Sequence, residues 1–127
     1  MPEPAMIAIV DDEQSVRRAL GRLVKSIGLQ AETFCSAEEF LESSADQNPR
    51  CLILDLRLPG ISGLELQRQL ARSEQRLPII FISAHDDAES RAQALGAGAI
   101  AFISKPFRDD LLLDAIHSAT ADSAPAE

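Results

Sequence analysis

Acidic, hydroxyl and cationic side chains follow four apolar runs of this 127-residue chain. In chain order, the runs lead to Asp11-Asp12, Asp55, Ser83 and Lys105. If the runs are strands of one parallel sheet, their carboxyl ends share an edge, where open α/β sheets bind ligands. The sequence therefore predicts that three carboxylates, a hydroxyl and an ammonium group converge at that edge.

Three neighbouring carboxylates restrict the chemistry of such a site. Their charges repel, so some of them would take up protons unless a cation neutralises them. A donor set of oxygens, without His or Cys, favours a hard ion, and Mg²⁺ held by carboxylates and water fits best. A carboxylate beside Mg²⁺ and Lys105 could act as a nucleophile toward phosphorus and form an aspartyl phosphate. Ser83 could donate a hydrogen bond to a phosphoryl oxygen.

Strands and helices that position these groups alternate along the chain. Apolar runs without polar alternation, such as Cys51-Leu52-Ile53-Leu54, predict strands buried on both faces. Apolar residues at the helical period follow Glu13, and capping boxes begin at Ser36 and Ser62. The helix expected after Asp86-Asp87 is weakly apolar, and we assign its inward stripe to Ala88, Ala92 and Leu95. The inward residues of the last helix are predicted to be Leu112, Ala115, Ile116 and Ala119.

Five predicted strands alternating with five helices indicate an α/β fold with a parallel sheet. Right-handed crossovers with helices on both faces leave doubly wound topologies, and the short chain favours the flavodoxin-like strand order 2-1-3-4-5. The switch point then lies between the first and third strands, which end in Asp11-Asp12 and Asp55. We expect one domain over residues 5–120, followed by a flexible tail or linker over 121–127.

Composition excludes several classes of protein. Hydrophobic content of 46% and charged content of 25% are ordinary for a soluble globular domain. No apolar run reaches the length of a membrane span, and the N-terminus does not have the pattern of a signal peptide. The net charge of −8 argues against binding to nucleic acid. Cys35 and Cys51 are isolated and predict small buried residues in a reducing, cytoplasmic compartment.

The set Asp11-Asp12, Asp55, Ser83 and Lys105-Pro106 resembles the bacterial two-component response-regulator receiver domain. The resemblance covers about Ile7 to Thr120, and the set is highly specific in its order and spacing. The segments DLRLPGISGLELQ, PIIFISAHDD and AFISKPF are similar to the FixJ-type subfamily of transcriptional regulators.

The resemblance implies a phospho-acceptor with a regulatory role rather than an enzyme. Asp55 would accept a phosphoryl group from a histidine kinase, with Lys105 and Ser83 contacting that group. Mg²⁺ would be bound by Asp12, Asp55 and the Arg57 carbonyl, with Asp11 reaching it through water. Arg57 and His85 would tune the lifetime of the phosphate, although either residue could simply face solvent.

The family also implies an output. Ser83 and Phe102 would form a switch, and the Lys105-Pro106 bond would be cis. Movement of Ser83 toward the phosphoryl group would open space for Phe102, and the face formed by the fourth helix, fifth strand and fifth helix would pair with a second copy. The output would be a DNA-binding helix-turn-helix domain that regulates transcription; alternatively, a stand-alone receiver would act through protein contacts.

Two other classes of protein remain alternatives from the residues alone. A flavodoxin-like carrier shares the fold, but an Asp-Asp-Glu loop would repel the phosphate of FMN, and the chain has no Trp or Tyr. An aspartate-nucleophile phosphohydrolase needs an acid two residues after its nucleophile, and position 57 is Arg.

Overall fold

The computed structural model describes residues 5–43, 49–73, 77–84 and 87–122. It contains five strands: β1 (Met6–Val10), β2 (Gln30–Phe34), β3 (Cys51–Asp55), β4 (Ile79–Ser83) and β5 (Ala101–Ser104). They alternate with five helices: α1 (Gln14–Ser26), α2 (Ala37–Ser43), α3 (Gly63–Arg72), α4 (Ala88–Gly96) and α5 (Asp109–Asp122). All four strand pairings are parallel and give the order β2-β1-β3-β4-β5, which confirms the predicted fold.

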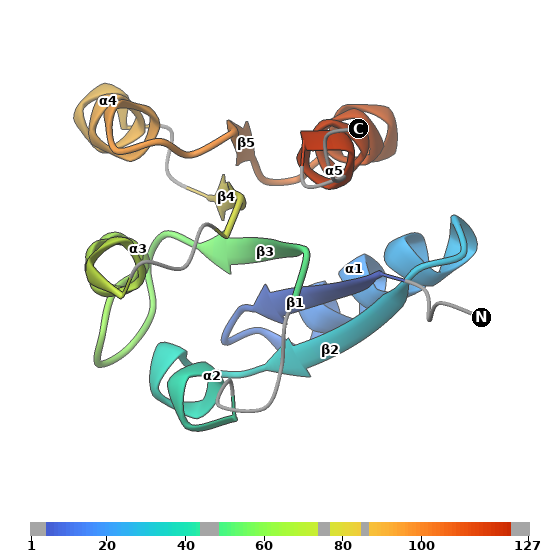
Figure 1. The fold of residues 1–127 in the computed structure, drawn as a ribbon, viewed down its shortest axis with the longest axis horizontal. Coiled ribbons are helices and arrows are strands. Elements are labelled where there is room, and N and C mark those ends of the chain that lie inside the picture. Colours follow the sequence, from blue (N-terminus) through green and yellow to red (C-terminus); the bar gives the residue numbers. More distant parts are fainter. Residues whose placement is uncertain (1–4, 44–48, 74–76, 85–86, 123–127) are drawn as a thin grey trace.

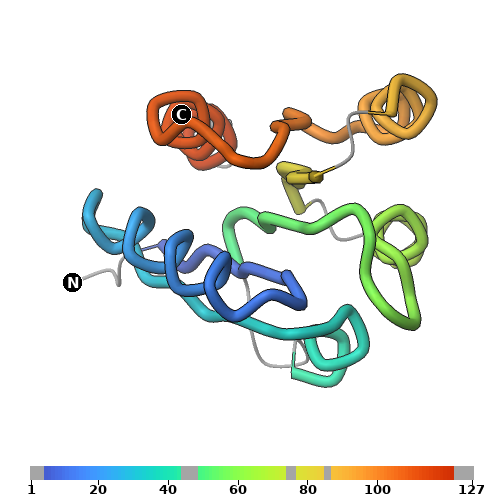
Figure 2. Tube along the Cα trace, turned by 180° about the vertical axis from the view of Figure 1, so that it is seen from behind, coloured from blue at the N-terminus to red at the C-terminus, as the bar shows by residue number. Residues whose placement is uncertain are grey.

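Helices cover both faces of the sheet and create two apolar layers (Figure 1). Phe40, Leu66 and Phe81 belong to the layer beneath α2, α3 and α4. The other layer lies beneath α1 and α5, which flank one another on the same face (Figure 2). The four residues assigned to the inner side of α5 are all buried in this second layer. β3 and β4 are buried along their whole length, because helices cover them on both sides.

The predicted inward stripe of α4 is wrong. Ala88, Ala92 and Leu95 are exposed, and Ala94 is the buried residue of this helix. Apart from Leu95, its apolar side chains are alanines, so the helix has no wide apolar stripe that would determine its rotation against the sheet. The structure instead links α4 to α3 by a hydrogen bond from the Gln67 side chain to the Ala94 carbonyl, 3.1 Å long. α4 therefore exposes two alanines, Ala88 and Ala92, and the larger Leu95 at the surface.

The two cysteines differ in their environment. Cys51 is buried in β3, as expected, but Cys35 is exposed at the turn between β2 and α2, which corrects the expectation for that residue. Among the helices that the structure describes, none is long and apolar enough to cross a membrane.

Candidate functional site

The carboxyl ends of β1 and β3 bring three carboxylates together. β1 pairs with β3 so that Val10 lies opposite Leu54, and each strand leads directly into an aspartate at the same edge. Oxygens of Asp11, Asp12 and Asp55 all lie within 4.8 Å of one another. Asp11 and Asp55 are buried, whereas Asp12 is exposed. The cluster predicted from the strand ends is therefore present.

Lys105 reaches this cluster from the end of β5. Its Nζ lies 3.0 Å from Asp11 Oδ2 and 3.4 Å from Asp55 Oδ2. The Lys105 backbone N–H donates a 2.7 Å hydrogen bond to the Ser83 carbonyl, which ties the ends of β4 and β5 together. The Lys105-Pro106 peptide bond is cis, as expected.

Burial and charge shift the pKa values of the two central groups. Burial, followed by repulsion from Asp11, raises the pKa of Asp55 from 3.8 to about 6, although Lys105 opposes this shift. Burial lowers the pKa of Lys105, but its contacts with Asp11 and Asp55 outweigh that effect and raise it. The ammonium group therefore stays charged, while one lysine only partly compensates the neighbouring carboxylates.

The carboxylate oxygens of the cluster could bind a metal cation in addition to the Lys105 ammonium group. Asp11 Oδ2 is fully buried and accepts no hydrogen bond of good geometry from the described residues, although Lys105 Nζ lies within ion-pair distance. Asp11 Oδ1 accepts a 2.8 Å hydrogen bond from the Glu13 backbone N–H. A hard divalent cation with oxygen ligands fits such a set of carboxylates, one of them exposed to water.

The remaining predicted site residues occupy different environments. Ser83 is buried at the end of β4. It directly follows Ile82, which lies opposite Asp55 in the sheet. Arg57 is exposed, and its backbone N–H donates a 3.3 Å hydrogen bond to Asp55 Oδ1. His85 lies outside the described residues, so the prediction for it has no structural counterpart.

Phe102 already points inward in this structure. The residue is 6% exposed, and its ring stacks on that of Phe81, with centroids 6.2 Å apart. The guanidinium of Arg91 on α4 lies 5.0 Å from the centre of the Phe102 ring. The switch expected from the sequence has this aromatic moving inward; the structure shows one inward position, and the movement stays a prediction.

Three residues that the sequence analysis did not single out also shape the site. Glu13 Oε1 lies 3.3 Å from Lys105 Nζ, so it competes with the aspartates for the same ammonium group. Glu38 of α2 accepts a 3.0 Å hydrogen bond from the Ile61 N–H and holds the loop that follows β3. A Cβ at Gly63 would collide with the Asp55 carbonyl oxygen, so α3 can approach the site closely only with glycine there.

Sequence signals for these three residues are weak. Glu13 directly follows Asp11-Asp12, so its sequence signal is an additional acid at the same strand end. The Glu38 carboxylate contacts the backbone of a distant loop, and Gly63 lets α3 approach Asp55; no local sequence pattern encodes either contact.

Comparison with known proteins shows which family the chain resembles. The family described as response regulator receiver domain matches residues 7–117. Nodulation protein W of Bradyrhizobium diazoefficiens is 47% identical over 116 residues, covering 91% of this chain and 51% of that protein. The response regulator protein TodT of Pseudomonas putida is 48% identical over 115 residues, with coverage of 91% and 51%. The crystal structure of FixJ-N superimposes with a TM-score of 0.87 at 36% identity, covering 99% of this chain and 100% of that one.

These matches confirm the FixJ-type resemblance and define its extent. The chain spans about half the length of the curated relatives, 51% of both Nodulation protein W and TodT. The similarity therefore describes the receiver part of those proteins.

Proposed function

The chain belongs to the response regulator receiver domain family, and from this premise we propose that Asp55 is the residue that accepts the phosphoryl group. A receiver is a regulatory phospho-acceptor of a two-component system rather than a conventional enzyme, and its phosphodonor is a histidine kinase. The observation that carries the assignment is the position of Asp55 between Lys105 and the acidic pair at the end of β1. No other described strand ends in a carboxylate that lies beside both Lys105 and a pair of acidic residues.

The proposed reaction transfers one phosphoryl group. An oxygen of Asp55 attacks the phosphorus of a phosphohistidine, the P–N bond breaks, and the released imidazole takes up a proton. Lys105, 3.4 Å from Asp55 Oδ2, is placed to offset charge on the transferring group. Ser83 would donate a hydrogen bond to a phosphoryl oxygen, while Arg57, with His85, would influence how fast water reaches the product.

Mg²⁺ is the cation that we assign to the acidic cluster. The carboxylates of Asp12 and Asp55 and the carbonyl of Arg57 would hold it, with Asp11 acting through water. When bound, Mg²⁺ supplies positive charge that offsets both the carboxylates and the phosphoryl oxygens. Asp11 Oδ2, buried without a hydrogen bond from the described part of the chain, supports this assignment.

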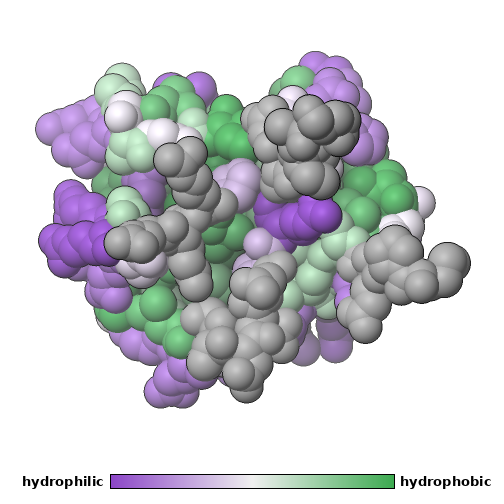
Figure 3. Space-filling model, viewed as in Figure 1, coloured by the Kyte–Doolittle hydropathy of each residue, from purple (hydrophilic) through white to green (hydrophobic). Residues whose placement is uncertain are grey.

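For the output, we assign the face formed by α4, β5 and α5. α4 is held by one buried residue, Ala94, which makes it the element that moves at least cost in buried surface. Leu95 of α4 is 40% exposed and Leu111 of α5 is 48% exposed, and apolar residues interrupt the hydrophilic surface over α4 (Figure 3). Phosphorylation would bias Ser83 and Phe102 toward a state in which this face pairs with a second copy.

The consequence for the cell depends on what the receiver controls. The relatives are named as response regulators and transcriptional regulatory proteins, and this chain covers about half of them. We propose that dimerisation controls a DNA-binding output domain in the cytoplasm. A stand-alone receiver acting by protein contact is the alternative.

Chemical mapping tests the acceptor assignment. The protein is incubated with acetyl phosphate and Mg²⁺, and sodium borohydride then reduces any acyl phosphate to an alcohol that marks the residue. Peptide mapping should find the mark at Asp55 and only when Mg²⁺ is present. A mark at Asp11 or Asp12 instead would overturn the proposal.

A further inference from the structure

A basic groove runs between α1 and the edge strand β2, on a chain whose net charge is −8. Its volume is about 520 Å³, and four cations line it: Arg17, Arg18, Arg22 and Lys25. No carboxylate is among the described residues that line the groove. The groove thus concentrates a third of the 12 lysines and arginines of an acidic protein in one place.

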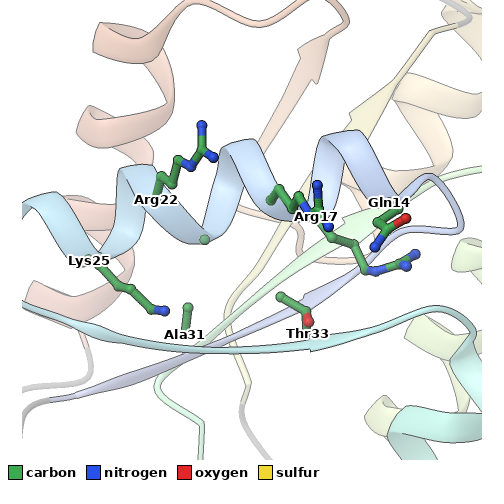
Figure 4. Close-up of a pocket in the computed structure, with 8 residues that line it drawn as sticks. Gln14, Arg17, Arg22, Lys25, Ala31 and Thr33 are labelled. Atoms are coloured by element: carbon green, nitrogen blue, oxygen red, sulfur yellow. The ribbon is translucent and has the colours of Figure 1, made fainter.

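The cations do not all point the same way. Lys25 extends from α1 toward Ala31 on β2, whereas Arg22 projects from the opposite side of the helix (Figure 4). Arg17 donates a 2.7 Å hydrogen bond from Nη1 to the Asp11 carbonyl, which anchors the amino-terminal end of the groove next to the acidic site. Thr33 lies on the opposing strand and adds a hydroxyl group to the wall.

Gly21 supplies a second, independent observation. It lies in the middle of α1, where glycine destabilises a helix by about 1 kcal/mol relative to alanine. Packing does not require this glycine, because a Cβ built on it would meet no atom within 4 Å. Its backbone φ is not in the left-handed region either, so a side chain would fit without strain. The missing side chain therefore serves to keep the groove open above Ala31.

A hollow kept open at a cost in helix stability and lined by cations fits an anionic ligand. We propose that the α1–β2 groove binds a small molecule of nucleotide size that carries two or more phosphate groups. Its volume lies within the range of about 300–1,000 Å³ typical of small-molecule sites. Recognition would depend on side chains, since the chain has no glycine-rich phosphate loop. The small floor formed by Gly21 and Ala31 leaves room for a flat group such as a base.

Binding of ATP, pyrophosphate and AMP, measured by calorimetry in buffer with EDTA and low salt, tests this site. Without Mg²⁺ the acidic cluster repels these anions, so the measurement does not depend on the phospho-acceptor assignment, and Asp55→Asn should bind them equally well. We expect ATP to bind more tightly than AMP, because more phosphate charge meets the cations. A similar affinity for ATP and pyrophosphate would show that the groove recognises the phosphates alone. A preference for ATP would show that it also recognises the base. Both results support the site.

Two variants separate the groove from a solvated basic surface. Gly21→Leu should fill the hollow and weaken ATP binding about tenfold, while the protein unfolds at the same or a higher temperature, because leucine is a good helix former. The double variant Arg18→Gln/Lys25→Gln should also weaken ATP binding about tenfold. Arg68→Gln/Arg72→Gln on α3, a matched loss of two charges elsewhere, should not.

Several results would overturn the proposal. One is the absence of binding by all three probes at millimolar concentration. Another is ATP binding that Gly21→Leu leaves unchanged. A third is displacement of ATP by single-stranded DNA or by an acidic peptide to the same extent in the wild type and in Gly21→Leu. That result would identify the groove as a general polyanion surface.

Discussion

Replacing Asp55 with asparagine should raise the free energy of unfolding of the metal-free protein at pH 7. The pKa of Asp55 is raised from 3.8 to about 6 by burial and by Asp11. An acid whose pKa is higher in the folded state holds its proton more tightly there than in the unfolded chain. Its ionisation therefore costs stability progressively as the pH rises from about 4 to about 6, and the full cost is present at pH 7.

The raised pKa also gives the size of the effect. A shift of one pKa unit corresponds to 1.36 kcal/mol, so a shift of about two units corresponds to about 3 kcal/mol. The pKa of about 6 already includes the attraction between Asp55 and Lys105, which lowers the pKa. Asparagine has nearly the shape of protonated aspartate and cannot ionise, so Asp55→Asn should remove this cost.

Urea denaturation of wild type and variant in EDTA measures the difference directly. It should be about 3 kcal/mol at pH 7 and fall to about half of that at pH 5. Asp114→Asn, the same substitution at an exposed position of α5, is the matched control and should stay within about 0.5 kcal/mol of wild type. An Asp55→Asn variant no more stable than wild type at pH 7 would refute the view that burial and repulsion by Asp11 make the ionised Asp55 costly in the folded state.

Three further predictions concern the metal, the close approach of α3 and the output. Saturating Mg²⁺ should raise the free energy of unfolding by about 1–3 kcal/mol, and Asp12→Ala should abolish this dependence while leaving the fold intact; a wild-type melting temperature insensitive to Mg²⁺ would contradict the metal site. Gly63→Ala should lower the free energy of unfolding in urea by about 1–3 kcal/mol, because its Cβ would collide with the Asp55 carbonyl oxygen. Gly96→Ala, whose Cβ meets nothing within 4 Å, should cause no such loss, and equal stability of the two variants would contradict this prediction. Beryllofluoride should convert a monomer into a weak dimer in sedimentation, and Phe102→Ala should weaken the dimer without blocking phosphorylation; one mass in both states up to high micromolar protein would refute the dimer.

Much of the fold and of the site is encoded at the ends of the strands. Apolar runs identified four of the five parallel strands, and the polar residues directly after them identified Asp11, Asp12 and Asp55, because parallel strands end at one edge. Lys105 reaches the same point from a different strand, as its place in the sequence predicted.

Features that depend on geometry between elements were not accessible from sequence. The rotation of α4 was mispredicted because alanines at several positions satisfy a helical stripe equally well, and only packing selected Ala94. Cys35 was expected to be buried because free cysteine usually is, but the turn after β2 exposes it. Glu38 contacts a loop 23 positions away, a pairing that no local pattern specifies.

Intact-mass measurement after incubation with acetyl phosphate and Mg²⁺ tests the central claim most directly, with wild type and Asp55→Asn treated side by side. Of the three clustered aspartates, Asp55 is the one that ends the central strand of the sheet, with Lys105 beside it. The wild type should gain the mass of one phosphoryl group, and Asp55→Asn should gain none. The same gain in both proteins would contradict the assignment of Asp55 as the phospho-acceptor.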